Sequence, residues 1–102
     1  MAVPGHPYGR TVLATELAVL GRATPGRRNR TLNRTAFKVY RYVGGGVLYD
    51  QDVTLAFTIV ARAIGLSAAE TARTLASARS AGLTNPRTVP APPDPSRQEI
   101  GP

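Results

Sequence analysis

Seven basic side chains between residues 22 and 41 are the residues best suited to binding chemistry. No Asp or Glu interrupts this stretch, although the whole chain has only thirteen Lys and Arg residues. Four of the seven recur at i, i+4, i+8 and i+11, so they share one face of a helix. The four are Arg30, Arg34, Lys38 and Arg41, and the others are Arg22, Arg27 and Arg28. Because stacked like charges repel one another, folding alone does not explain the pattern, which favours a polyanionic partner.

A turn that carries two arginines precedes this expected helix. Gly26 permits a tight turn and a close approach of the backbone to a ligand. Arg27 and Arg28 follow at the helix start, where unpaired amide groups and the helix dipole favour an anion. Guanidinium groups at such a position predict a phosphate-binding site.

Two asparagines, one helical turn apart, lie between the apolar and the basic faces of the same helix. Asn29 is expected either to cap the helix or to contact a phosphate. Asn33 lies inside the helix, where asparagine is mildly unfavourable. It is therefore expected to bond a neighbouring loop in the core or to contact a nucleotide or phosphate.

Three aromatic residues border the basic face and are candidate stacking rings for nucleobases. Phe37 fills the core or stacks on a base, while Tyr40 is expected at the core edge and Tyr42 in a more exposed position. Aromatic rings interleaved with arginines suit single-stranded nucleic acid, since bases stack on the rings while cations take the phosphates. Further along, Arg73 and Arg79 either extend the positive surface or are simply solvated.

Residues suited to catalysis or metal binding are few. The chain has no Cys, and His6, its one histidine, is expected to be solvated in a Pro/Gly-rich start, so no Ser-His-Asp site is predicted. Asp50 and Asp52 are expected to serve a helix start rather than a metal ion. The run of three glycines at 44–46 lacks the lysine and hydroxyl of a phosphate-binding loop and predicts a helix stop. We therefore predict no catalytic residue, no metal site and no resident cofactor.

Length and charge narrow the class of protein. A chain of 102 residues has room for one small domain, and its net charge of +7 favours nucleic acid or an anionic surface. The N-terminus lacks the apolar segment of a signal peptide, and no apolar run approaches the roughly 18 residues that span a bilayer. We therefore expect a cytoplasmic protein that does not enter a membrane.

Helical periodicity predicts an all-α fold, a small four-helix bundle with flexible Pro/Gly-rich termini. The clearest start signal is the capping box of Ser67 and Glu70. The bundle domain is expected over 9–83, after a flexible leader at 1–8 and before a proline-rich disordered tail or linker at 84–102. The four helices are expected at about 9–21, 29–43, 50–64 and 67–83.

The stretch at 26–37, GRRNRTLNRTAF, is similar to the signature G-x-RN-x-x-LN-x-A-A-F of bifunctional DNA primase/polymerases of actinobacteria, their plasmids and phages. Residues 43–48 resemble the helix end of that family, and residues 64–83 resemble its last helix. The resemblance spans about residues 8–87. Thr35 stands where the family has alanine, and the doubled Arg27-Arg28 leaves the register of the motif's arginine open.

The resemblance implies a helical domain that lies behind the catalytic primase-polymerase domain. Such a domain helps to hold single-stranded template DNA and the initiating nucleoside triphosphate during primer synthesis. Arg27 or Arg28, Asn29 and Asn33 are the residues that it implies near phosphates.

We therefore expect a non-catalytic, nucleic-acid-binding accessory module of a replication primase. The expected phosphate-binding residues are Arg27, Arg28, Asn29, Arg30, Asn33, Arg34, Lys38 and Arg41. One alternative is a helix-turn-helix regulator of duplex DNA, to which the glycine connector at 44–46 is a poor match. Another is a protein-docking module whose basic face meets an acidic partner.

Overall fold

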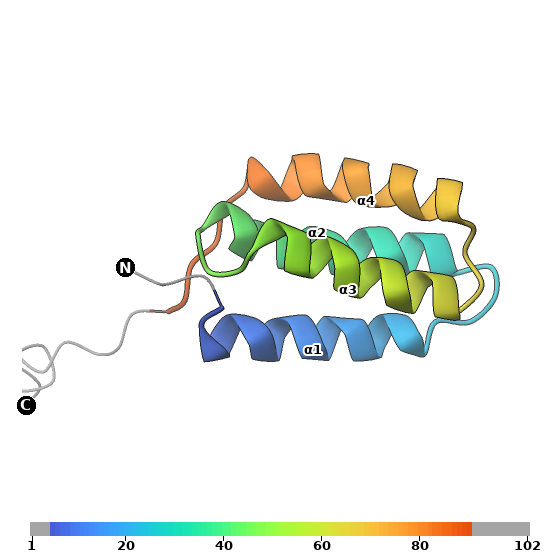
Figure 1. The fold of residues 1–102 in the computed structure, drawn as a ribbon, viewed down its shortest axis with the longest axis horizontal. Coiled ribbons are helices and arrows are strands. Elements are labelled where there is room, and N and C mark those ends of the chain that lie inside the picture. Colours follow the sequence, from blue (N-terminus) through green and yellow to red (C-terminus); the bar gives the residue numbers. More distant parts are fainter. Residues whose placement is uncertain (1–4, 91–102) are drawn as a thin grey trace, which may run out of the picture.

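Four helices follow one another along residues 5–90, the part of the chain that the computed structural model describes (Figure 1). They are α1 (Pro7–Gly21), α2 (Arg28–Gly44), α3 (Asp50–Ala63) and α4 (Ala68–Leu83). No strand occurs among the described residues. The predicted all-α bundle of four helices is confirmed, and the helices begin and end close to their predicted bounds.

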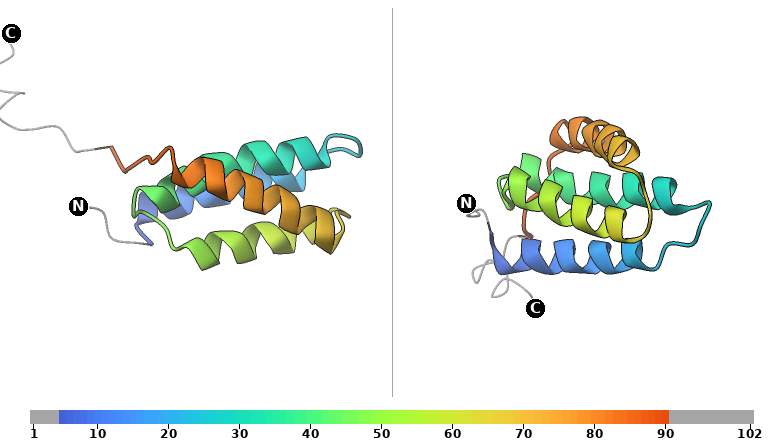
Figure 2. Two further views of the ribbon diagram at one scale, coloured as in Figure 1. Left: turned by 90° about the horizontal axis from the view of Figure 1, so that it is seen from above. Right: turned by 45° about the vertical axis from the view of Figure 1, so that its right-hand side comes forward.

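The most extensively packed helix is α2, which, like α3, contacts each of the other three and packs above all against α4. Figure 1 shows α4 and α1 on opposite sides of the bundle, and the view from above in Figure 2 shows α2 and α3 on the two remaining sides. The outward faces of α2 and α3 therefore point away from each other. No helix within residues 5–90 combines the length and the apolar character that crossing a bilayer requires.

The core forms where one side of α2 meets the apolar sides of its neighbours. Leu32, Ala36 and Val39 of α2 are completely buried, and so are Leu20 of α1 and Phe57 of α3. Burial of such side chains is the main favourable contribution to folding. Since these residues take up one side of α2, the charged residues of this helix are left on the opposite side.

Two tyrosines lie deeper than the sequence indicated. Tyr40 is completely buried, its hydroxyl lies 2.5 Å from Thr54 Oγ1, and burial raises its pKa. Tyr42 was expected to be exposed, but only 4% of it is accessible. That prediction is wrong because the Tyr8 ring, at 6.1 Å, and the Arg87 guanidinium, at 5.7 Å, cover the Tyr42 ring.

The ends of the helices follow some of the predicted signals. Ser67 Oγ accepts the Glu70 N–H at 3.1 Å and caps α4, as predicted. Gly46 has a φ of +77°, which suits glycine, just after α2 ends. His6, expected to be solvated, is half-buried, and its Nδ1 accepts the Tyr8 N–H at the start of α1.

Asp50 does not cap α3, because the helix begins at Asp50 itself and Tyr49 holds the N-cap position. Its carboxylate instead accepts hydrogen bonds from Arg79 of α4, with Arg79 Nη2 at 2.6 Å from Oδ2. These hydrogen bonds are the first cause of the lowered pKa of Asp50. Arg79 is thus paired rather than part of an open positive surface.

The chain on either side of the helices also contacts the bundle. Gly5 donates its N–H to the carbonyl of Val47 at 2.8 Å, and Arg87 donates its N–H to the carbonyl of Arg41 at 2.8 Å. Val89 packs against the core. The described parts of the predicted leader and tail are therefore attached to the bundle, while 1–4 and 91–102 lie outside the described residues.

A close crossing of α2 and α4 depends on glycine. A Cβ on Gly82 would lie 2.6 Å from Tyr40 Cβ and 3.0 Å from the Tyr40 carbonyl carbon. Both neighbours belong to a buried residue at the centre of the bundle, so neither can move aside cheaply.

We expect Gly82→Ala to lower the free energy of unfolding by about 1–3 kcal/mol, because the added methyl group overpacks this crossing. Gly21→Ala is the matched control, since a Cβ there meets nothing within 4 Å. Urea titrations followed by circular dichroism compare the two. A Gly82→Ala protein as stable as Gly21→Ala would contradict the assigned crossing.

Candidate nucleic-acid interface

The basic residues of α2 lie on its outward side, opposite the core. Arg30, Arg34 and Lys38 are exposed, and Arg41 is half-buried. The helical spacing accounts for this, because residues at i, i+4 and i+7 share a face. The cations therefore occupy the strip of α2 between its neighbours α1 and α4.

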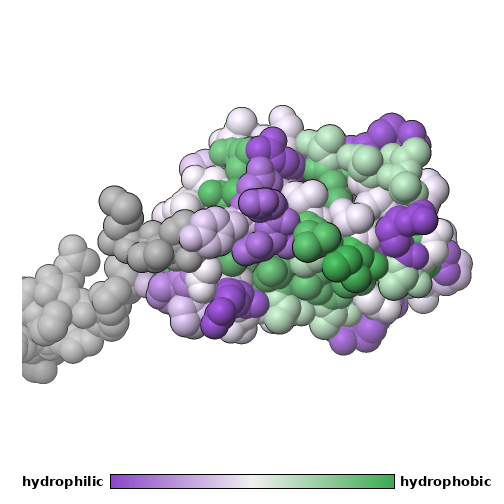
Figure 3. All heavy atoms as spheres, viewed as in Figure 1, coloured by the Kyte–Doolittle hydropathy of each residue, from purple (hydrophilic) through white to green (hydrophobic). Residues whose placement is uncertain are grey.

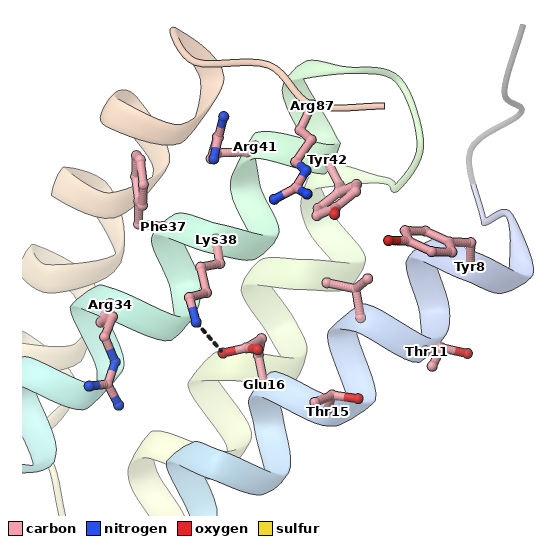
Figure 4. A pocket seen from close by; sticks show the side chains of 11 residues that line it. Tyr8, Thr11, Thr15, Glu16, Arg34, Phe37, Lys38, Arg41, Tyr42 and Arg87 are labelled. Carbon is pink, nitrogen blue, oxygen red and sulfur yellow. Dashed lines mark ion pairs between the residues drawn. The ribbon is translucent and has the colours of Figure 1, made fainter. Parts of the chain in front are cut away.

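Part of this strip forms one wall of a cleft between α1 and α2, with a volume of about 640 Å³ (Figure 4). Arg34, Lys38 and Arg41 line it from α2, and Arg87 reaches it from the segment after α4. Apolar surface between the charges comes from Val12, Phe37 and Tyr42. The opposite wall is α1, which contributes Tyr8, Thr11, Thr15 and Glu16.

Glu16 is the one carboxylate in the lining of this cleft. Its Oε1 lies 3.9 Å from Lys38 Nζ, and the Lys38 side chain is 54% exposed. The Glu16 side chain is only 14% exposed. A pair with so long a separation and an exposed ammonium group contributes little to stability, and it leaves the ammonium group able to turn to another anion. Four cations against one carboxylate give the cleft a net positive charge.

Arg41 and Arg87 are held in place before any ligand arrives. Arg41 Nε donates to the carbonyl of Asn85 at 2.8 Å, and the Arg41 guanidinium carbon lies 5.8 Å from the centre of the Phe37 ring. Cation–π contacts of this kind stabilise an arginine without using its remaining N–H groups. These two arginines can therefore bind an anion with little loss of conformational freedom.

Arg87 was missed as a binding residue because the proline-rich composition of 84–102 indicated an unstructured tail. Its place depends on Gly45, where any Cβ would overlap the Arg87 carbonyl group. The glycine run thus does more than stop α2, since it also makes room for the returning chain. The sequence did carry one signal of this contact. A helix stop needs one glycine, whereas three follow one another at 44–46, so the additional glycines indicated a close approach of another segment.

Base stacking on Tyr40 or Tyr42 is incompatible with their burial. Tyr40 is 0% exposed, and Tyr42 is covered by Tyr8 and Arg87, so neither ring has an open face. The stacking predictions for these two residues are wrong because both rings serve packing. Phe37, half-buried, and Tyr8, 38% exposed, are the aromatic residues at the cleft that a base can reach.

The two arginines before α2 do not join the cleft. Arg27 is exposed and takes the N-cap position without a side-chain cap. Arg28 turns to the α3–α4 connection, where its Nη1 lies 3.1 Å from the position of a Cβ on Gly65. Its Nε is buried and has no hydrogen-bond partner within the described residues. The predicted joint phosphate site of Arg27 and Arg28 is therefore not assembled, and Arg30 also lies outside the cleft lining.

Asn29 connects α2 to α4 instead of capping α2. Its amide nitrogen donates to Glu70 Oε2 at 3.1 Å and to Thr74 Oγ1 at 2.6 Å. The cap prediction fails because α2 begins one residue before Asn29, with Arg27 at the N-cap. These bonds also use both amide donors of Asn29, which leaves only its carbonyl oxygen for a ligand.

Asn33 makes no side-chain hydrogen bond within the described residues, and it does not enter the core. It is exposed and lines a shallow hollow of about 220 Å³ between α2 and α4. Asn29, Arg73, Thr74 and Ser77 complete this hollow. The expectation of a core contact for Asn33 is therefore wrong.

Comparisons with protein-family models, with curated proteins and with solved structures found no match to this sequence. The resemblance of residues 26–37 to the primase/polymerase signature stays a prediction. The assignment of a function accordingly depends on the geometry of the cleft.

The two asparagines are expected to differ in their effect on stability. Asn29→Ala should lower the free energy of unfolding by about 1–3 kcal/mol, because it leaves the half-buried Glu70 carboxylate and Thr74 hydroxyl without this partner. Asn33→Ala should change it by less than about 0.5 kcal/mol, since its side chain is exposed. Parallel urea denaturation measures both, and equal losses would show that Asn29 is not a specific link.

Proposed function

We propose that this protein is a non-catalytic, cytoplasmic module that holds single-stranded DNA along the outward face of α2. One observation carries the proposal: four cations from two separate segments line a single cleft that contains one carboxylate. Folding gives no benefit from gathering like charges in this way, whereas a phosphate chain neutralises them.

The spread of the cations suits a chain of phosphates better than one isolated phosphate. Arg34 and Arg41 are seven residues apart, about 10 Å along the helix axis. Lys38 lies between them, and Arg87 lies over the ring of Tyr42, the residue that follows Arg41. Phe37 and Tyr8 offer ring surface for one or two bases while the cations hold the backbone.

The position of α2 favours a single strand over duplex DNA. A recognition helix must protrude to enter the major groove. α2 is flanked by α1 on one side and α4 on the other, and its cations line a cleft rather than a ridge. A flexible strand can follow such a cleft, but a rigid duplex cannot.

A role beside a primase-polymerase catalytic domain is supported by the sequence resemblance at 26–37. In such an assembly the module would keep the template close to the site of primer synthesis. A nucleoside triphosphate is a second proposed ligand, for which Asn33 and Arg73 supply polar groups in the hollow between α2 and α4.

Arg34→Ala and Arg87→Ala should each weaken binding to a labelled single-stranded oligonucleotide by about threefold to tenfold at low salt. Each should also reduce the slope of log K against log [salt] by about 0.7, because one fewer phosphate is neutralised. Fluorescence anisotropy at several salt concentrations gives both quantities. Arg22→Ala, an exposed arginine outside the cleft lining, is the matched control and should leave affinity and slope nearly unchanged.

A competition experiment separates the proposed function from its alternatives. We expect unlabelled single strand to displace the probe at concentrations at least about tenfold lower than duplex of the same sequence. Equal competition by duplex would favour a duplex-binding regulator. Weak binding that does not change with salt would favour a protein-docking role and contradict the proposal.

A further inference from the structure

The outward face of α3 carries the two most exposed of the large hydrophobic side chains among the described residues. Leu55 is 62% exposed and Ile59 is 59% exposed, one helical turn apart. Figure 3 shows hydrophobic surface gathered in the middle of the face on which α3 lies. Single exposed apolar side chains are common, but two neighbouring ones on one helix form a patch that association can bury.

The residues on either side of this pair give the face a definite pattern. Asp52 lies three residues before Leu55, and Arg62 lies three residues after Ile59; both are exposed. Spacings of three, four and three residues place all four side chains on one face of the helix. We call Asp52, Leu55, Ile59 and Arg62 the α3 stripe. Its order is acidic, apolar, apolar, basic, with the same spacing in both directions.

We propose that the α3 stripe is a self-association surface, which pairs with the α3 stripe of a second copy of this chain. The two helices run antiparallel across a two-fold axis that passes the midpoint between Leu55 and Ile59. Leu55 of each copy then packs on Ile59 of the other, and Asp52 of each copy faces Arg62 of the other. A two-fold interface requires such self-complementarity, and this spacing supplies it.

Charge complementarity favours a second copy as the occupant. The stripe itself is neutral, with one acidic and one basic residue, although the chain as a whole carries a net charge of +7. The nearby Asp50 is already paired with Arg79 of its own chain. Arg62 Nη1 donates to the carbonyl of Leu66 at 3.0 Å, which holds the guanidinium at the end of the stripe and leaves its other N–H groups available.

The pairing also keeps the strongly cationic surfaces apart. α2 and α3 lie on opposite sides of the bundle (Figure 2), so two copies joined through α3 turn their α2 faces outward. Repulsion between the two basic strips is then at its smallest. The proposal does not depend on nucleic-acid binding, because none of its residues lines the α1–α2 cleft.

The expected association is weak. One pair of helices buries less than the roughly 1,200 Å² that marks a stable interface. We therefore expect the dimer to be populated at protein concentrations of about 100 µM and above. Sedimentation equilibrium of the full chain, from about 10 µM to 1 mM, should show the mean molar mass rising from 10.8 kDa towards twice that value.

Two kinds of variant test the stripe. Leu55→Glu should weaken association at least about tenfold, since it places a charge at the centre of the contact. The bundle itself should be unaffected because Leu55 is exposed, and circular dichroism checks this. Arg34→Asp, on the opposite face, is the control and should associate like the wild type.

A charge exchange tests the antiparallel register. Asp52→Arg alone and Arg62→Asp alone create like-charge pairs, so each should self-associate about tenfold more weakly than the wild type. A mixture of the two single variants restores an Arg–Asp pair at both ends and should associate again. The double variant D52R/R62D should associate like the wild type. In a parallel pairing like charges would already face each other in the wild type, so neither single variant would associate more weakly than the wild type does.

Three results would overturn the proposal. One is a wild-type chain that stays at 10.8 kDa up to about 1 mM. Another is a Leu55→Glu protein that associates as strongly as Arg34→Asp. The third is a pair of single charge variants that associate as well alone as they do together.

Discussion

The two-sided character of α2 is the constraint on which the rest of the structure depends. Leu32, Ala36 and Val39 must be buried against three other helices, and all three are inaccessible to solvent. Since side chains on one helix keep fixed angles to each other, this burial also fixes where Arg34, Lys38 and Arg41 point. The same hydrophobic contacts that stabilise the bundle therefore aim its cations into the cleft between α1 and α2.

Polar links between helices then set how far α2 lies from its neighbours. Asn29 bonds to Glu70 and Thr74 of α4, and Tyr40 bonds to Thr54 of α3. A half-buried polar group without its partner would destabilise the fold, so these links favour one arrangement of the helices over others. Asn29 and Tyr40, whose side chains could also have bound a ligand, therefore serve here to connect helices.

The helices were predictable because their signals are local. Ser67 and Glu70 mark the start of α4, and the glycines at 44–46 mark the end of α2, in each case within a few residues of sequence. The strip of Arg34, Lys38 and Arg41 followed from spacing alone. The predictions failed for three residues whose surroundings come from distant segments of the chain. Tyr42 is covered by Tyr8 and Arg87. Arg28 lies near Gly65, and Arg87 lies beside Gly45. No periodicity within one helix carries that information.

The segment that brings Arg87 to the cleft makes the cleft sensitive to mechanical load. It is attached by one backbone hydrogen bond to Arg41, by the Arg41 side chain at Asn85, and by the packing of Val89. The Arg87 guanidinium also lies over the Tyr42 ring, at 5.7 Å. These contacts are few compared with the core that holds the helices together. Tension on the chain after residue 90 would therefore withdraw one cation and release the Arg41 guanidinium while every helix stayed folded.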